Sequence, residues 1–115
     1  VQFGNEADLT ITHLDDMENV VMKNFLPGDL AYDMNFHILS FEPGASHSFV
    51  ETHVQEHGMY ILEGEGIYLL DEDWRMIKKG DFVWFGPYCP QAAYATGRER
   101  FTYIYSKDCN RDVVL

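Results

Sequence analysis

Four side chains with the chemistry of metal ligands lie at short spacings in this chain. Glu51, His53 and His57 fall within one segment, and Gln91 follows further along. Two neutral imidazoles, a carboxylate and a carboxamide oxygen form a mixed nitrogen and oxygen set without thiolate. Such a set suits Mn²⁺, Fe²⁺ or Zn²⁺, and its two oxygen donors favour the harder Mn²⁺. This ligand count leaves coordination positions open, which is typical of catalytic metal sites.

The stretch from His53 to His57 has two competing interpretations. It also reads H-x-x-E-H, a metalloprotease pattern that needs both histidines on one face of a helix. The neighbouring Gly58 and the strand-like surroundings argue against a helix. The histidines could also be surface or core residues that hold no metal. The combination of Glu, two His and Gln favours a metal site over both alternatives.

The elements that must position these residues are short strands. Strand-like runs recur about every 8–12 residues with Gly and Pro turn signals between them, and no segment keeps a helical period for long. This pattern predicts an all-β sandwich or barrel. The runs are residues 35–41, 59–62, 67–70, 74–77, 82–85 and 101–105.

The domain prediction divides the chain at residue 25. Residues 1–25 are acidic and carry one short alternating segment, so we expect a linker or an edge strand. Residues 26–115 form the predicted metal-binding domain. Within it, Glu51 and His53 should share one strand face, because side chains two residues apart point the same way. A bulge or tight loop would bring His57 back toward them, and Gln91 would come from a different strand.

The composition of the chain limits the classes of partner that it can bind. The 115 residues carry a net charge of −11, which makes nucleic acid and anionic membranes poor partners. Cys89 and Cys109 form neither a CxxC pair nor a disulfide framework, so we expect reduced thiols in a cytoplasmic protein. No apolar run approaches the roughly 18 residues of a membrane span, and no signal peptide is visible.

Two motifs resemble those of the cupin family. The segment from Gly44 through the candidate ligands to Gly64 is similar to the first cupin motif, G-x5-H-x-H-x3/4-E-x6-G. The Gly80-Asp81 turn and the run from Gly86 to Gln91 resemble the second motif, G-x5-P-x-G-x2-H. In this chain glutamate replaces the first histidine, histidine replaces the glutamate, and glutamine replaces the last histidine.

This exchanged Glu-His-His-Gln set is similar to that of the (S)-ureidoglycine aminohydrolases, manganese cupins of allantoin degradation in purine catabolism. Residues 62–68 and the tail 103–112 also resemble the bacterial form of that family. The resemblance covers the chain from about residue 26 onward. It implies a cupin double-stranded β-helix, or jelly roll, that corresponds to the C-terminal half of a bicupin.

The resemblance also implies an activity. An enzyme of this family is an amidine-type C–N hydrolase that releases ammonia from (S)-ureidoglycine and gives (S)-ureidoglycolate. Its substrate is a small molecule, and we expect a homo-oligomer. Carried to this chain, the family pattern implies that Mn²⁺ is held by Glu51, His53, His57 and Gln91. It implies substrate contacts from Tyr68, Tyr103 and Lys107, and we expect Glu51 and Lys107 to move protons.

Other functions stay open at this point. The chain could be another metal cupin, such as an Fe²⁺ dioxygenase or an isomerase, or a non-catalytic cupin that binds a small acid. From the residues alone, Lys107 could be a solvated surface lysine, and Tyr68 and Tyr103 could be core aromatics. His13, His37 and His47 have no partner at useful spacing and are interpreted as structural or solvent-facing.

Overall fold

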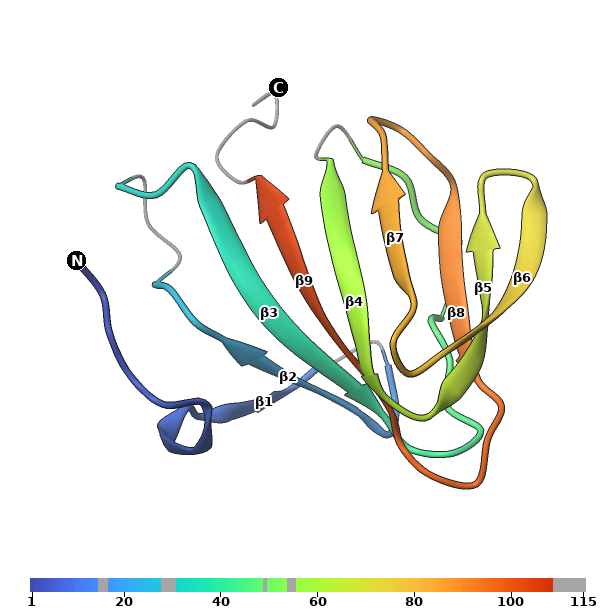
Figure 1. The fold of residues 1–115 in the computed structure, drawn as a ribbon, viewed down its shortest axis with the longest axis horizontal. Helices are drawn as coiled ribbons and strands as arrows, with labels where there is room; N and C mark the ends of the chain where they lie inside the picture. The colour runs from blue at the N-terminus through green and yellow to red at the C-terminus, as the bar shows by residue number, and fades with distance from the viewer. Residues whose placement is uncertain (15–16, 28–30, 49, 54–55, 109–115) are drawn as a thin grey trace.

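The structure is a computed structural model that describes residues 1–14, 17–27, 31–48, 50–53 and 56–108. Within these residues the chain folds into β-strands and one short 3₁₀ turn, η1 (Glu6–Asp8) (Figure 1). The strands are β1 (Ile11–His13), β2 (Val20–Asn24), β3 (Met34–Phe41), β4 (His57–Glu63), β5 (Glu65–Leu70), β6 (Asp73–Lys78), β7 (Phe82–Phe85), β8 (Gln91–Ala95) and β9 (Phe101–Asp108).

The strands form two antiparallel sheets. A six-stranded sheet has the order β1-β2-β3-β9-β4-β7, and a three-stranded sheet has the order β6-β5-β8. Figure 1 shows the last strand, β9, between β3 and β4, with the smaller sheet beyond β7. Isolated bridges from Ser46 to Tyr94 and from Glu51 to Gln91 connect the long segment before β4 to β8. The predicted all-β jelly roll is confirmed.

The predicted strand runs all coincide with strands, but they do not include β2, and the strand expected at Gln91 was given no bounds. β2 lies inside the segment expected to be a linker or edge strand, and it pairs with β3 along its whole length. β8 has the sequence Gln-Ala-Ala-Tyr-Ala, and alanine has little preference for strands. The domain boundary at residue 25 stays a prediction.

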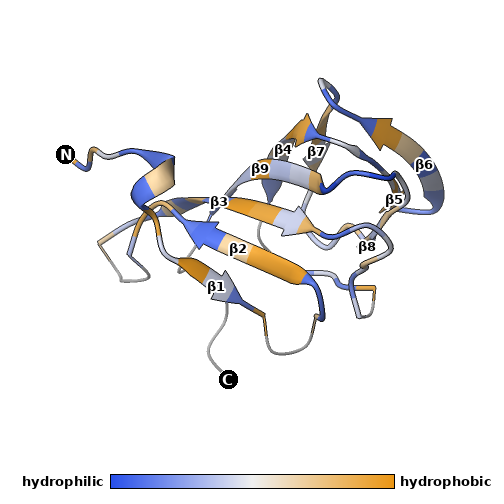
Figure 2. Ribbon diagram, turned by 90° about the horizontal axis from the view of Figure 1, so that it is seen from below, coloured by the Kyte–Doolittle hydropathy of each residue, from blue (hydrophilic) through white to orange (hydrophobic). Residues whose placement is uncertain are grey.

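The interior changes from apolar to polar along the strands. At one end of the barrel, the inward-facing Phe41 of β3 pairs with Phe101 of β9, and both are fully buried. At the other end, Asn35 of β3 pairs with Lys107 of β9, which pairs in turn with His57 of β4. In Figure 2, β2 is hydrophobic at its start and hydrophilic at its end. The polar end is where a site can form.

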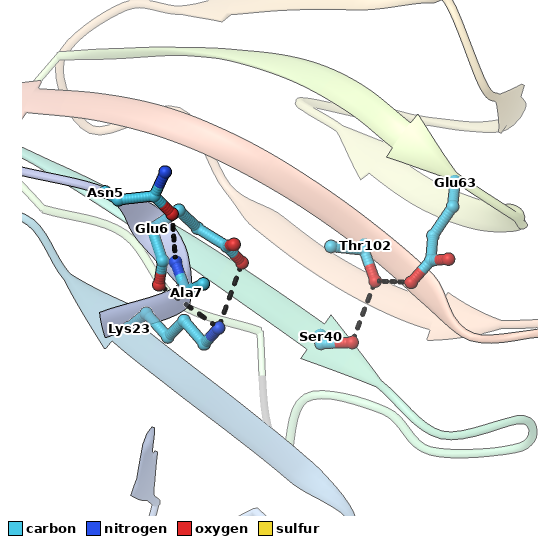
Figure 3. A network of polar contacts seen from close by, with 7 residues as sticks. All are labelled: Asn5, Glu6, Ala7, Lys23, Ser40, Glu63 and Thr102. Atoms are coloured by element: carbon cyan, nitrogen blue, oxygen red, sulfur yellow. Dashed lines mark hydrogen bonds and ion pairs between the residues drawn. The ribbon is translucent and has the colours of Figure 1, made fainter. Parts of the chain in front are cut away.

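The outward face of the large sheet carries a polar network that is separate from this interior (Figure 3). The Thr102 hydroxyl donates to Glu63 Oε1 at 2.6 Å and lies 2.8 Å from Ser40 Oγ. Lys23 Nζ donates to Glu6 Oε1 at 2.9 Å and so holds the 3₁₀ turn on β2. Of these contacts, the Lys23–Glu6 ion pair links the N-terminal segment to the sheet.

The sequence analysis predicted that the chain has no membrane span and that its cysteines are reduced thiols. No helix in the described part of the chain is long and apolar enough to cross a membrane. Cys89 is a free thiol, and Cys109 lies outside the described residues.

Candidate metal and substrate site

One cavity between the two sheets collects every site residue that the sequence predicts. Its volume is about 190 Å³. It is lined by the predicted residues Glu51, His53, His57, Tyr68, Gln91, Tyr103 and Lys107, together with Leu14, Met17, Met22, Leu39, His47 and Tyr105. The chain therefore brings together predicted site residues that are up to 56 positions apart, from Glu51 to Lys107, in one small volume.

Strand register explains how the lining residues meet. Side chains two residues apart on a strand share a face, so Tyr103, Tyr105 and Lys107 of β9 all point inward. His57 opens β4 directly opposite Lys107. Gln91 opens β8 in the other sheet, so the cavity lies between the two layers.

The predicted ligand segment is held to β8 by backbone hydrogen bonds. The Glu51 N–H donates to the Gln91 carbonyl at 3.0 Å, and the Gln91 N–H donates to the Glu51 carbonyl at 2.9 Å. The predicted bulge or loop before His57 includes positions 54–55, which lie outside the described residues. His57 itself begins a strand, so His53 and His57 do not share a helix as the H-x-x-E-H interpretation requires.

The two imidazoles and the carboxamide converge. Gln91 Nε2 lies 3.3 Å from His53 Nε2, and the ring centroids of His53 and His57 are 5.1 Å apart. Both ring nitrogens of His57 and Oε1 of Gln91 are buried without a hydrogen-bond partner among the described residues. Buried polar atoms are normally satisfied, so this group of unsatisfied atoms calls for partners such as an ordered water or an ion.

Electrostatics keep His57 neutral. Burial, followed by the neighbouring His53 and the cation of Lys107, lowers the pKa of His57 to about 4, although the nearby carboxamide of Gln91 opposes the shift. A neutral imidazole is the form that coordinates a metal. The environment of His57 therefore prepares it to act as a ligand near neutral pH.

Glu51 lines the same cavity as the tyrosines. After the dominant effect of burial, its negative charge raises the pKa of the Tyr68, Tyr103 and Tyr105 phenols. In the described part of the chain, no three His, Cys, Asp or Glu side chains gather closely enough to hold a metal. The unsatisfied atoms of His57 and Gln91 are nitrogen and oxygen donors of the kind that a metal takes.

The phenols form a second feature of the cavity. The hydroxyls of Tyr68 and Tyr103 are 3.4 Å apart, and burial raises the pKa of each well above its usual value. Both side chains are almost completely buried. Each phenol therefore stays protonated and can donate a hydrogen bond into the cavity.

The sequence prediction missed two polar residues of this cavity. His47 lines it, rather than being only structural or solvent-facing, and its Nδ1 accepts the Ala93 N–H at 2.8 Å. That bond places the proton of the neutral ring on Nε2. Tyr105 also lines the cavity, and its position midway between Tyr103 and Lys107 on one strand face was the signal that could have revealed it.

Comparison with known proteins identifies the fold and its relatives. The cupin domain family matches residues 37–106. Over 113 residues the chain is 58% identical to an (S)-ureidoglycine aminohydrolase of Escherichia coli K12, covering 97% of this chain and 43% of that protein. An (S)-ureidoglycine aminohydrolase of Arabidopsis thaliana is 40% identical over 91 residues, covering 79% of this chain and 30% of that protein.

A solved structure agrees with these relationships. The crystal structure of a putative glyoxylate-induced protein from Pseudomonas aeruginosa has a TM-score of 0.84 and 42% identity, covering 97% of this chain and 43% of that one. The chain thus spans less than half the length of the curated relatives it matches.

Proposed function

The chain belongs to the cupin domain family, and from that premise we propose that it is the metal-binding, ammonia-releasing domain of an (S)-ureidoglycine aminohydrolase. The observation that carries the proposal is the composition of the cavity between the sheets. It contains an exchanged Glu-His-His-Gln ligand set, a lysine and protonated phenols, and its unsatisfied buried atoms belong to two of the proposed ligands.

The proposed metal ligands are Glu51, His53, His57 and Gln91. When bound, Mn²⁺ would supply Lewis acidity and a fixed template for the substrate. His57 contributes a neutral, buried imidazole, and Gln91 contributes an amide oxygen that has no other partner in the described structure. The mixed donors favour Mn²⁺ over softer ions.

The substrate of this activity carries a carboxylate, an amine and a ureido group on one carbon. Lys107 places a cation inside a protein of net charge −11, so it is the described residue suited to bind the carboxylate. Tyr68 and Tyr103 donate hydrogen bonds to the neutral polar part of the substrate. These contacts orient the central carbon toward one face of the cavity.

The reaction exchanges one bond at that carbon. The bond to the amine nitrogen breaks and ammonia leaves with one added proton, while the oxygen of water bonds to the same carbon and gives up a proton. Glu51 and Lys107 are the proposed carriers of these protons, because both line the cavity and have opposite charges in their ionised forms. Addition of water to one face gives the (S) product.

Two variants test these roles in the presence of Mn²⁺. Glu51→Gln should lose either bound metal or turnover, whereas the exposed Glu72→Gln should change neither. Lys107→Met should keep one metal per chain and lose turnover, and the exposed Lys79→Met serves as its control. Wild-type metal content and turnover in both Glu51→Gln and Lys107→Met would refute the assignment.

The alternative functions predict different results in the same assay. An Fe²⁺ dioxygenase would consume oxygen, and a non-catalytic cupin would bind a small acid without releasing ammonia. A cytoplasmic location, a homo-oligomer, a bicupin full-length protein and the lack of nucleic-acid or membrane partners stay predictions within this proposal.

A further inference from the structure

Tyr105 lines the cavity and has no role in the function proposed above. Its ring stacks on His37 with centroids 4.8 Å apart and meets the ring of His57 edge-on at 5.7 Å. The ring of Tyr103 lies 5.9 Å away. These contacts on three sides fix the phenol, so its hydroxyl has a defined direction.

The hydroxyl of Tyr105 has only a weak partner. It points to Met22 Sδ at 3.9 Å, and this is the single hydrogen bond that the described structure gives it. A thioether is a poor acceptor, whereas a tyrosine hydroxyl in a protein interior usually finds a good one. By contrast, the hydroxyls of Tyr68 and Tyr103 are close enough to satisfy each other in part. Tyr105 therefore has a donor available for a ligand.

We propose that Tyr105 is a further substrate-binding residue, whose hydroxyl donates a hydrogen bond to the carbonyl oxygen of a ureido acid in the cavity. The class of ligand rests on the proposed function. Tyr105 and Lys107 lie two positions apart on one face of β9, so their Cα atoms are about 7 Å apart. In a ureido acid, one carbon and one nitrogen separate the carboxylate from the ureido carbonyl. A carboxylate on Lys107 thus brings the carbonyl toward Tyr105.

The test is a binding comparison that does not depend on turnover. N-carbamoylglycine is a ureido acid that lacks the reactive amine, and glycolate is a small acid that lacks the ureido group. The dissociation constant of each is measured by calorimetry with Mn²⁺ present, for the wild-type chain and for Tyr105→Phe. The variant keeps the ring contacts and removes one hydroxyl. The half-exposed Tyr94→Phe is the matched control.

We expect Tyr105→Phe to weaken binding of N-carbamoylglycine by about 2- to 13-fold, the range for loss of one neutral hydrogen bond. Binding of glycolate, and both constants of Tyr94→Phe, should not change. Unchanged binding of the ureido acid by Tyr105→Phe would overturn the inference. An equal loss for both acids, or no binding of N-carbamoylglycine by the wild-type chain, would overturn it as well.

Turnover separates this inference from the function on which it rests. If the wild-type chain binds N-carbamoylglycine through Tyr105 but releases no ammonia from ureidoglycine, the inference stands and the proposed function fails. If ammonia is released and Tyr105→Phe retains the wild-type KM, the proposed function stands and the inference fails.

Discussion

Replacing Gln91 by methionine separates the cost of an unsatisfied buried amide from its proposed value as a metal ligand. Gln91 is almost fully buried, its Oε1 has no partner in the described structure, and its Nε2 contacts His53. Methionine has a similar length and no amide. The backbone bridge to Glu51 uses main-chain atoms only, so the substitution leaves it intact.

In the metal-free protein, two opposing effects change the free energy of unfolding of Gln91→Met. Removing an unsatisfied buried acceptor gains about 1–3 kcal/mol, and losing the contact with His53 costs about 0.5–1.5 kcal/mol. The free energy of unfolding of Gln91→Met should therefore lie between about 0.5 kcal/mol below and about 2.5 kcal/mol above that of the wild type.

With metal the wild type gains more stability than the variant. At a Mn²⁺ concentration of about 100 times the wild-type dissociation constant, binding stabilises the wild type by about 2.7 kcal/mol. If loss of one ligand weakens binding about 100-fold, the same concentration stabilises Gln91→Met by only about 0.4 kcal/mol. Urea unfolding with EDTA and with Mn²⁺ measures both terms, and the exposed Gln2→Met is the control.

Two results would refute this reasoning. Equal stabilisation of wild type and Gln91→Met by Mn²⁺ would show that the amide is not a ligand. A loss of more than about 2 kcal/mol in EDTA would show that Gln91 makes a structural hydrogen bond of the ordinary kind.

Three further predictions concern stability. In urea unfolding, Gly64→Ala should destabilise the fold by several times the roughly 1 kcal/mol expected of Gly44→Ala. Both glycines have positive φ, but of the two only Gly64 would bring a Cβ to 2.1 Å from a backbone oxygen, that of Arg100. Equal losses of stability in the two variants would contradict this prediction. Burial lowers the pKa of His37 to about 4, so the unfolded state binds more protons than the folded state as the pH falls below 6.5. The contribution of His37 to the free energy of unfolding is therefore complete above pH 6.5 and is lost as the pH falls toward 4. A stability–pH profile of His37→Gln should therefore be flatter between pH 6.5 and 4 than that of the wild type, and an unchanged slope would count against it. Phe41→Ala should cost about 3–5 kcal/mol by chemical denaturation, since the side chain is fully buried against other aromatic rings, and a cost below about 1 kcal/mol would show that the core collapses around it.

Local patterns in the sequence were sufficient to predict most of the strands. Alternating apolar runs and glycine turns located most strands, because a two-residue period and a left-handed turn are properties of a few neighbouring residues. Gly44, Gly64 and Gly80, each at an expected turn, all have positive φ. A strand at Gln91 was expected, but its bounds were not, because the alanines of β8 carry little strand preference and its place depends on pairing with β5.

The candidate site was predictable in its residues and not in its geometry. The spacing of Glu51, His53 and His57, and the resemblance that it supports, indicated the lining of one cavity. The register that sets His57 opposite Lys107 depends on pairing between strands about 50 residues apart, which no local pattern specifies. The same is true of Tyr105, whose packing on His37 required the pairing of β3 with β9.

The most direct test of the central claim is ammonia release from ureidoglycine, generated in situ, by the chain with Mn²⁺, with the enantiomer of ureidoglycolate followed in the same sample. The account predicts release well above the uncatalysed rate and formation of the (S) product alone. Release at the uncatalysed rate by metal-loaded protein, or a racemic product, would contradict it.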